Sequence, residues 1–575
     1  MKKIIALLTL LIAWSALSAA PISEQQARRI AANFFSRGVT RATESLELAW
    51  AGHSFENASR NGEEPLLYIY NRNDRDGFVI VAGEEGASPI IGYSEERPFE
   101  VERIAPGARY LLESWMKQLA ALRSGRQVQV EAITSPGEVV RKFPTALWDQ
   151  WTPYNNEAPI YDGYRSVTGC VATALAIICH YHRYPTKGVG TTGAYSYYDP
   201  TGIERSIAPH TLGRSYNYDK MLSDYSQGYT KEEGAAVAAL MHDIGKAVKM
   251  QYHYNESGAY GNDARYGMLT HFGYSRNAVL MPGDAFTYKE WIKLVRENIE
   301  QYGPTYFSGS LAEGGHAFVL DGYTQNNYFS INYGWSGAGN GYYLLPLIEY
   351  SEGQWAMCRY EPDPNGTSTD PGQLVLYPYG DMLGLRSMAV EHRTGVPFTI
   401  QPGAVANIGD TQFTGTVGLA LCRADGSIKE YLFTTRLSLE PYYLVVYQSE
   451  QVTINSQIEE GDRLRMVYLK DSENEPVWAR KYGSTVVDDL ILVATPEEAA
   501  SQVSLQYDKT GKTIYLTAPY AIGYSLTQIS TGKEIGSGRV ASYNEGAIDT
   551  SSCTKGNYRL SISSGGRAYE LTIKL

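Results

Sequence analysis

The chain has 575 residues, more than one hydrophobic core usually serves, so we expect three or four domains. Its 50 basic and 62 acidic side chains give a formal net charge of -12, which argues against a general nucleic-acid binder. Apolar residues make up 43% of the chain and exclude a disordered protein, and five cysteines are too few for a disulfide scaffold. The composition leaves room for one cysteine that is kept for chemistry.

The first 19 residues have the pattern of a secretory signal peptide. Lys2 and Lys3 give a positive start, Ile4–Trp14 form a short apolar run, and small residues follow. We therefore expect residues 1–19 to be removed and the protein to be secreted, either free or associated with the cell surface. The alternative is an uncleaved anchor, although the apolar run is short for a membrane span.

Residues 20–140 begin as a small α+β unit. Ser23 opens a helix capping box, and apolar residues follow it at helical spacing. Two apolar runs, Leu66–Tyr70 and Phe78–Ala82, flank a polar turn and predict a β-hairpin. The spacing of apolar residues over Leu111–Leu119 predicts a second amphipathic helix.

A polar connector follows this unit. Residues 123–142 contain Pro136 and Gly137 and end in the basic pair Arg141 and Lys142. Exposed segments of this kind are where proteolytic cleavage concentrates, so we expect the chain to be cut here.

Strand patterns dominate the C-terminal part of the chain. Pro362–Gly372 is a linker by composition. Short alternating apolar runs follow it, with turn residues between them, and predict two all-β, sandwich-like domains over residues 373–490 and 496–575. The clearest runs are Leu374–Tyr377, Thr416–Leu421, Tyr442–Tyr447 and Leu464–Leu469.

Cys170 stands at the start of a strongly apolar stretch. Gly169 supplies a turn, and Val171–Cys179 is almost continuously apolar, which predicts a helix that is buried on all faces. The dipole at a helix N-terminus lowers the pKa of a thiol and favours the thiolate. The stretch alone leaves open whether Cys170 is a nucleophile or a packing residue, whereas Cys179 is predicted to be a small buried side chain.

His316 and Asn332 give Cys170 two catalytic partners. His316 lies 146 residues after Cys170, at the start of a predicted strand in Gly314–Gly322, and Asn332 follows 16 residues later. Thiol catalysis needs a thiolate, an imidazole that shares its proton, and a group that orients the imidazole. The order Cys, His, Asn on successive elements is that of papain-like enzymes.

Around these residues the sequence resembles the streptopain family of papain-like cysteine peptidases. The resemblance covers roughly residues 22–350 and rests on several motifs in the family's order. They are Trp148–Asn155, Thr168–Ala174, Tyr181–Pro185, Leu240–Lys246, Gly314–Gly322, Asn332–Trp335 and Asn340–Tyr343, with Phe78–Gly83 and Pro89–Tyr93 in the N-terminal unit. The resemblance implies a papain-like α+β peptidase domain over residues 141–361 and, before it, an inhibitory α+β propeptide over residues 20–140.

The resemblance also assigns roles to single residues. It implies Cys170 as the nucleophile and His316 as its base and acid. Asn332 would orient the imidazole, Trp335 would shield that contact from water, and Gln150 would donate a hydrogen bond to the oxyanion.

Two departures from the family pattern bear on specificity. Tyr333 stands where the family usually has tryptophan, and the segment Ser351–Trp355 is short where a long glycine-rich loop is expected. Substrate preference is therefore expected to differ from that of the family.

No metal site and no cofactor are predicted. The chain has no HExxH, CxxC or P-loop pattern. His180 and His182 are two positions apart, which is poor spacing for metal ligands on a helix, and His242 and His253 have no partner at ligand spacing.

The last unit, residues 496–575, resembles the C-terminal sorting domains of type IX secretion, which are small β-sandwiches. The similar stretches are Thr531–Ile535, Ile548–Thr550, Gly556–Ile562 and Tyr569–Leu575. The resemblance implies that this tail meets the secretion machinery and directs export across an outer membrane, and it leaves open whether the tail is then removed. The alternative is an ordinary β-sandwich accessory domain.

These patterns predict a secreted cysteine endopeptidase, made as a zymogen, that hydrolyses peptide bonds through a Cys–His dyad and a thioester. Its expected partners are protein or peptide substrates, its own propeptide as an intramolecular inhibitor, and secretion machinery, but no nucleic acid. One alternative is a catalytically silent papain-like adhesin or binding protein carried on β-domains. Another keeps the cysteine chemistry and transfers the acyl group to an acceptor other than water.

Overall fold

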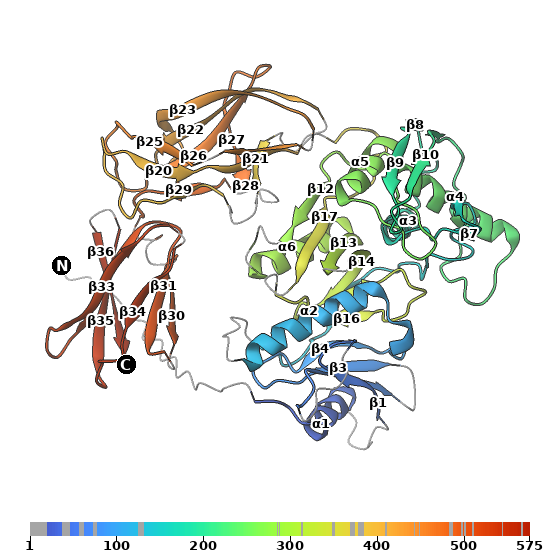
Figure 1. Ribbon diagram of the computed structural model, residues 1–575, viewed down its shortest axis with the longest axis horizontal. Coiled ribbons are helices and arrows are strands. Elements are labelled where there is room, and N and C mark those ends of the chain that lie inside the picture. The colour runs from blue at the N-terminus through green and yellow to red at the C-terminus, as the bar shows by residue number, and fades with distance from the viewer. Residues whose placement is uncertain are drawn as a thin grey trace. The chain divides into compact units, whose positions relative to one another are not determined.

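A computed structural model gives the fold of the chain (Figure 1). It describes residues 20–36, 46–56, 63–72, 77–124, 132–283, 286, 288–311, 314–347, 351–368, 374–377, 384–408, 411–441, 443–447, 449–481, 487–495, 498, 502–508, 511–542, 544–564 and 567–575. The predicted signal peptide therefore lies outside the described residues. The chain divides into two compact units, Met1–Tyr274 with Tyr288–Cys358 and Ser275–Thr287 with Arg359–Leu575.

The first unit contains six α-helices within the described residues. They are α1 (Glu24–Phe35), α2 (Pro106–Arg123), α3 (Cys170–His182), α4 (Lys231–Ala247), α5 (Gly261–Phe272) and α6 (Tyr288–Tyr302), with short 3-10 helices η1 (Val101–Arg103) and η2 (Tyr218–Lys220). Its strands are β1 (Leu46–Gly52), β2 (Leu67–Arg72), β3 (Phe78–Ala82), β4 (Ile90–Ser94), β5 (Val139–Lys142), β6 (Ile160–Tyr161), β7 (Tyr164–Arg165), β8 (Thr191–Thr192), β9 (Tyr195–Tyr198), β10 (Glu204–Ile207), β11 (His210–Thr211), β13 (Thr305–Leu311), β14 (Gly314–Thr324), β15 (Phe329–Asn332), β16 (Gly341–Tyr343) and β17 (Glu352–Cys358).

One sheet runs through the N-terminal unit and the peptidase region. Its strand order is β1-β2-β3-β4-β16-β15-β14-β13-β17, so the N-terminal strands continue the sheet of the peptidase region (Figure 1). The junction is antiparallel, with Tyr93 of β4 opposite Tyr342 of β16. This pairing covers the edge of β16 with backbone hydrogen bonds, which an exposed edge strand would otherwise leave open.

The N-terminal unit confirms its sequence-based elements. The capping box forms, because Ser23 N donates to Gln26 Oε1 at 2.9 Å and Gln26 N donates to Ser23 Oγ at 3.4 Å. The predicted hairpin forms as β2 and β3, although its turn lies largely outside the described residues. The second predicted helix, α2, begins at Pro106, five residues before the predicted stretch. Proline fits at the first helical position, because the backbone N–H that it lacks would have no partner within the helix there.

The predicted connector is not free chain throughout. Its last residues form β5, which pairs with β14 and places Lys142 opposite Gly322. A Cβ atom at Gly322 would lie 2.3 Å from the Arg141 carbonyl oxygen, so the close approach requires glycine. Arg141 donates to Glu300 at 2.7 Å, and Lys142 Nζ lies 2.7 Å from an oxygen of buried Asp321. The basic pair is thus fixed to the peptidase region.

The second unit is rich in strands, as predicted, and all of them except β12 form small, mostly antiparallel sheets. Its strands are β12 (Val279–Pro282), β18 (Leu374–Tyr377), β19 (Arg386–Ser387), β20 (Phe398–Gln401), β21 (Gly403–Asn407), β22 (Phe413–Cys422), β23 (Ile428–Leu439), β24 (Leu444–Tyr447), β25 (Glu450–Val452), β26 (Arg463–Lys470), β27 (Val477–Trp478), β28 (Arg480–Lys481), β29 (Asp489–Ile491), β30 (Ser504–Asp508), β31 (Thr513–Thr517), β32 (Ile522–Gln528), β33 (Glu534–Val540), β34 (Gly546–Asp549), β35 (Asn557–Ser564) and β36 (Arg567–Lys574). Two main clusters of buried apolar side chains form within it, one over residues 374–492 and one over residues 491–562.

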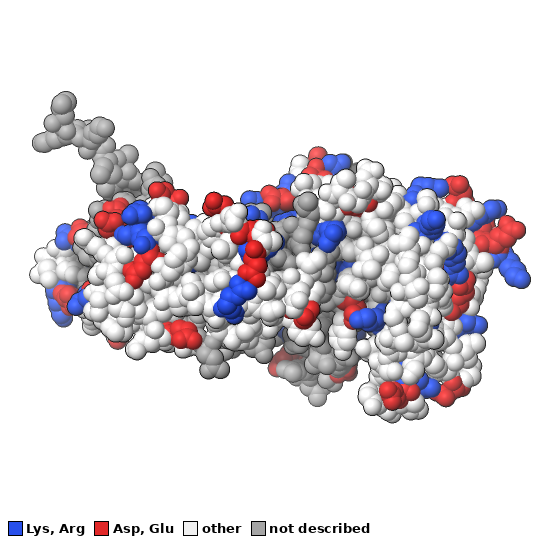
Figure 2. All heavy atoms as spheres, turned by 90° about the horizontal axis from the view of Figure 1, so that it is seen from above, with Lys and Arg blue, Asp and Glu red and all other residues white. Residues whose placement is uncertain are grey.

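The described surface carries both signs of charge. On the face that Figure 2 draws, acidic and basic side chains are interspersed, with no broad field of either sign. Within the ranges that the structure describes, no helix combines the length and the apolar character that a membrane crossing requires.

Candidate active site

Cys170 is the first residue of α3, as the sequence predicts. Gly169 precedes it with a φ of +87°, and a Cβ atom there would lie 2.5 Å from Met250 Sδ, so both the backbone angle and the space favour glycine. Residues 170–179 are all buried, which confirms a helix that is apolar on every face. The Cys170 side chain therefore lies in an apolar environment at the positive end of a helix dipole.

His316 lies on β14, opposite Gly309 of β13. Its Nε2 lies 3.2 Å from the Tyr333 carbonyl oxygen. Because a carbonyl can only accept, the ring hydrogen belongs on Nε2, and Nδ1 is left with the lone pair that can take a proton from the thiol. The His316 side chain is buried, 6% exposed.

The thiol and the imidazole act on each other. Burial by itself raises the pKa of the Cys170 thiol, but the charge and hydrogen bond of His316 lower it, as do backbone hydrogen bonds at Ala317 and Val171. The lowering effects win, so the pKa of Cys170 lies below its ordinary value. Cys179, on the same helix, differs, because burial raises the pKa of its thiol to about 12. The structure thus brings the two predicted catalytic residues together and distinguishes the two cysteines of α3.

Asn332 lies at the end of β15, one residue before the carbonyl that meets His316. Its side-chain Nδ2 donates to Thr145 Oγ1 at 3.0 Å and to the Ala146 carbonyl at 2.8 Å, and its Oδ1 accepts from Gly334 N at 3.1 Å. These bonds hold the turn around the Tyr333 carbonyl. Asn332 therefore bears on the imidazole through the backbone, a route that the residue pattern alone could not reveal.

Trp335 lies beside the imidazole. Its ring and that of His316 have centroids 6.2 Å apart and meet edge to face at 77°. The ring of Trp151 packs against the ring of Trp335, with centroids 4.8 Å apart and an angle of 85° between the planes. Trp151 is itself 41% exposed. Two tryptophans from separate segments thus meet next to the dyad, and Trp151 was not among the predicted site residues.

Gln150 is buried and lies close in structure to the segment that leads into α3. Its carbonyl accepts from Thr168 N at 3.1 Å, two residues before Cys170. The preceding Asp149 links the same segment to the Trp335 turn, since its carboxylate accepts from Gln150 N at 2.6 Å and from Ser336 Oγ at 2.5 Å. The motif around Gln150 was visible in the sequence, but nothing in it indicated that Asp149 would link this segment to the turn that carries Trp335.

Helix α2 of the N-terminal unit packs directly on the site. A Cβ atom at Gly107 would lie 2.7 Å from His316 Cδ2 and 2.8 Å from Tyr333 Cδ1. One turn along α2, the Tyr110 ring fills the space at Gly309, where a Cβ atom would lie 2.1 Å from it. The helix therefore covers His316 at a distance that only glycine permits.

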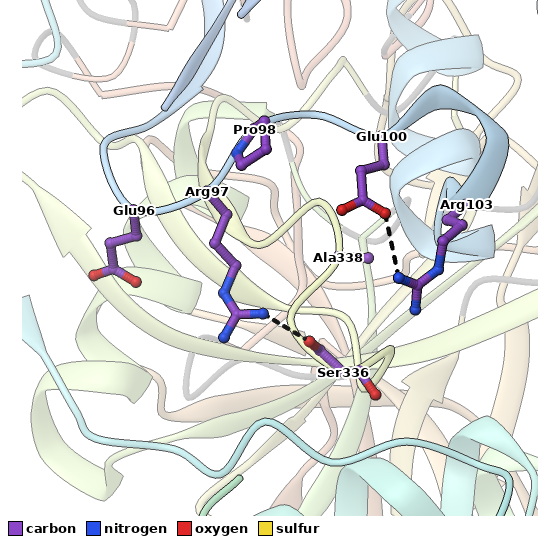
Figure 3. Close-up of a pocket in the computed structure, with 7 residues that line it drawn as sticks. All are labelled: Glu96, Arg97, Pro98, Glu100, Arg103, Ser336 and Ala338. Atoms are coloured by element: carbon purple, nitrogen blue, oxygen red, sulfur yellow. Dashed lines mark hydrogen bonds and ion pairs between the residues drawn. The ribbon is translucent and has the colours of Figure 1, made fainter. Parts of the chain in front are cut away.

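A loop of the N-terminal unit also contacts the peptidase region. Arg97 Nη1 donates to the Ser336 carbonyl at 3.1 Å, and the Arg97 guanidinium lies 3.7 Å from the Asp224 carboxylate. Figure 3 shows Arg97 reaching Ser336 across a pocket of about 380 Å³, which Glu100 and Ala338 also line. The pocket lies along the seam between the two regions.

Two protein families match the chain, one over the peptidase region and one over the N-terminal unit. Residues 148–343 match the model of the Peptidase C10 family, and residues 19–119 match that of the Spi protease inhibitor. The chain belongs to the C10 family of cysteine peptidases. The inhibitor match covers α1, β1–β4 and most of α2, so this C10 chain carries an inhibitor-like propeptide ahead of its peptidase region.

Three C10 relatives illustrate how far the similarity extends. The thiol protease/hemagglutinin PrtT of Porphyromonas gingivalis is 29% identical over 399 residues, which cover 64% of this chain and 45% of PrtT. Streptopain of Streptococcus pyogenes is 27% identical over 355 residues, 57% of this chain and 86% of streptopain. The solved structure of interpain A from Prevotella intermedia is 32% identical, covers 40% of this chain and 95% of its own, and gives a TM-score of 0.34. The chain spans less than half the length of PrtT.

Proposed function

We propose that the chain is a secreted cysteine endopeptidase that hydrolyses peptide bonds in proteins and is made as a zymogen. The observation that carries the proposal is the pairing of Cys170, at the start of a buried helix, with His316, which lowers the pKa of the thiol. A lowered thiol pKa beside an imidazole is the condition for nucleophilic catalysis by cysteine.

In the first half of the reaction the Cys170 sulfur attacks the scissile carbonyl carbon, and His316 holds the proton that the thiol has lost. The carbonyl oxygen becomes negative. The Cys170 backbone N–H has no partner within α3, because it belongs to the first turn, and it donates to this oxygen together with the Gln150 amide. The C–N bond then breaks, His316 gives its proton to the leaving amine, and a thioester remains.

In the second half a water molecule attacks the thioester carbonyl while His316 takes one of its protons. The C–S bond breaks, the acid product leaves, and the proton returns to the thiolate–imidazole pair. Asn332 supports both halves by holding the turn that presents the Tyr333 carbonyl to Nε2, and Trp335 shields this hydrogen bond from water.

The propeptide keeps the peptidase inactive in this proposal. Gly107 of α2 rests on the His316 ring and Tyr110 fills the space at Gly309, so a substrate backbone has no access to the dyad while α2 is docked. Cleavage in the connector and release of residues 20 to about 134 free the site. The inhibitor-like character of residues 19–119 supports this role.

The test of this function is hydrolysis of an unstructured protein substrate by the purified, processed chain. Cys170→Ala is expected to reduce hydrolysis to background and to stop self-processing, because no other group supplies the nucleophile. Cys179→Ala is the matched control on the same helix and should retain activity, since its thiol is buried and protonated. Self-processing of pure Cys170→Ala protein would contradict the assignment.

A second candidate is a papain-like adhesin without turnover. The name of PrtT joins thiol protease and hemagglutinin, so one relative is described by both activities. The lowered pKa of Cys170 favours an active peptidase, because a silent domain has no need of an activated thiol.

A third candidate keeps the cysteine chemistry but transfers the acyl group to an acceptor other than water. Transfer of the acyl group to an added amine, detected as a new amide product, would distinguish this transferase from a hydrolase.

The C-terminal region supplies location rather than chemistry in this proposal. Residues 373–490 and 496–575 are proposed as two β-sandwich domains, each with its own cluster of buried apolar side chains. The last domain is proposed as a sorting signal for type IX secretion, on the stretches named above. Together with the signal peptide pattern of residues 1–19, this directs the peptidase out of the cell.

A further inference from the structure

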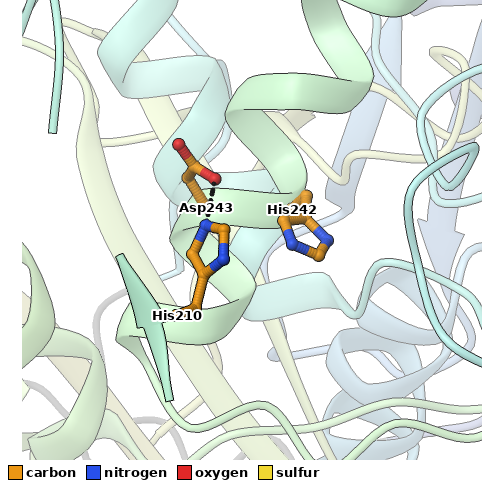
Figure 4. A group of neighbouring side chains, drawn as sticks. All are labelled: His210, His242 and Asp243. Carbon is orange, nitrogen blue, oxygen red and sulfur yellow. Dashed lines mark hydrogen bonds and ion pairs between the residues drawn. The ribbon is translucent and has the colours of Figure 1, made fainter. Parts of the chain in front are cut away.

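Two histidines and an aspartate from separate elements meet in the peptidase region, outside the dyad (Figure 4). His210 begins β11, while His242 and Asp243 lie on α4, and one ligand atom of each lies within 4.8 Å of the others. The rings of His210 and His242 have centroids 4.9 Å apart and are almost perpendicular, at 85°. The histidines are 32 positions apart, so sequence spacing gave no sign of the cluster.

Each imidazole is held through one nitrogen, and its other nitrogen has a lone pair available. His242 Nδ1 lies 2.8 Å from the Glu157 carbonyl oxygen, which can only accept, so Nε2 carries the lone pair. His210 Nε2 lies 2.9 Å from Asp243 Oδ1, which leaves its lone pair on Nδ1. Histidines that bind metals are fixed in the same two ways, by a backbone carbonyl or by a carboxylate.

Asp243 is a support for this cluster rather than a third ligand. It is fully buried, and besides His210 it accepts hydrogen bonds from Arg214 Nε at 3.0 Å and Nη2 at 2.8 Å and from the Tyr216 hydroxyl at 2.8 Å. Its oxygens are therefore already occupied. Glu157 pairs with Arg214, so the carboxylates of Asp243 and Glu157 stand against the positive charges of Arg214 and of Lys246, which acts on His242.

We propose that His210 and His242 bind one divalent transition-metal ion of the zinc type, with Asp243 orienting the His210 ring. Imidazole nitrogens suit Zn²⁺, Cu²⁺ and Ni²⁺, and water fills the remaining positions of the ion. The ion would tie β11 to α4. The inference rests on the geometry of the cluster and is independent of peptide hydrolysis.

The test uses the full chain with Cys170→Ala, because the dyad itself offers a thiolate and an imidazole to zinc. Isothermal titration with Zn²⁺ is expected to show one ion per chain. His242→Gln and His210→Gln should each weaken binding by at least about tenfold, the loss typical even of an outer-shell change. Glutamine can still donate a hydrogen bond to the Glu157 carbonyl, and His253→Gln is a control outside the cluster. Unchanged affinity in His242→Gln, or no binding in the parent chain, overturns the proposal.

A second measurement needs no change to the cluster. X-ray absorption at the zinc edge of the loaded Cys170→Ala chain is expected to show scattering from two imidazole rings and from oxygen. A zinc environment with oxygen alone, or with sulfur, would place the ion elsewhere and overturn the assignment even if the glutamine variants fail to fold.

Discussion

At the residue scale, the hydrogen bond between His316 and the Tyr333 carbonyl decides which nitrogen of the imidazole carries the hydrogen. It fixes the ring hydrogen on Nε2 and leaves the lone pair of the ring on Nδ1. The order of Cys170, His316 and Asn332 was enough to predict the dyad from the sequence. The carbonyl contact was not predictable, because a backbone oxygen leaves no mark on residue type.

The lowered pKa of Cys170 gives a pH prediction. The groups that lower this pKa are His316 and the backbone at Ala317 and Val171, which lie in the peptidase region and remain after processing. Loss of the propeptide reduces the burial of the thiol, which by itself raises the pKa. In the processed enzyme the rate of thiol alkylation should therefore fall away only below pH 9.0, the ordinary thiol value. His316→Gln protein that wild-type enzyme has processed in trans should show a higher midpoint of the alkylation profile.

The expected profile has a clear contrary outcome. A midpoint at or above 9.0 in the wild-type enzyme, or the same midpoint in His316→Gln, would show that the imidazole does not activate the thiol. Cys179 does not confuse the measurement, because the pKa of its thiol is about 12.

At the scale of elements, the closeness of α2 to His316 depends on one glycine. Gly107 lies in a helix, where alanine in its place would favour the helix by about 1 kcal/mol. The same substitution puts a Cβ atom 2.7 Å from the His316 ring. Helix propensity and packing thus predict opposite effects on the docking of the propeptide.

Gly107→Ala is expected to weaken docking and to speed the disappearance of the full-length chain in a fresh preparation, measured by gel densitometry. Packing should win, because the contact is with a ring buried on a sheet. Ala120→Val, at an exposed position of the same helix, should process at the wild-type rate. Slower processing of Gly107→Ala would mean that helix stability governs docking instead.

The position of β5 divides the predicted connector between the two regions. Ile133 N donates to Ser88 Oγ at 2.9 Å on the propeptide side, whereas Asn326 Nδ2 donates to the Ser135 carbonyl at 2.7 Å on the peptidase side. The sequence predicts a polar linker over residues 123–142, because β5 is short, exposed at all four positions and shows no alternation of buried and exposed residues. Its pairing with β14 is set by a partner 180 residues away.

The N-terminus of the processed enzyme should therefore fall at or before Ser135 and leave β5 in place. Mass spectrometry of the new N-terminus measures this, and neutralising Arg141 and Lys142 by glutamine should not move it. An N-terminus beyond Lys142 would contradict the account, because it would require β5 to leave the sheet.

At the scale of the whole molecule, sequence patterns predicted the succession of regions better than the contacts between them. The capping box, the buried helix after Gly169 and the short strands after residue 373 are local signals, and each appears in the structure. The sheet that joins β4 to β16 and the cluster of His210 with His242 arise from residues far apart in the chain. Local periodicity carries no information about such pairings.

The five cysteines make the central claim testable on the whole chain. All five are thiols and not disulfides, and four of them, Cys170 included, are buried. Burial raises the pKa of Cys179 to about 12 and that of Cys422 to about 11, whereas the pKa of Cys170 is lowered. A peptidyl epoxide that traps reactive thiolates should therefore discriminate sharply among them at neutral pH.

The most direct measurement is peptide mapping of the processed protein after reaction with this epoxide at neutral pH. The account predicts one adduct per chain, located on Cys170, and none in His316→Gln protein that wild-type enzyme has processed in trans. No adduct would favour the silent adhesin, and an adduct on another cysteine would contradict Cys170 as the nucleophile.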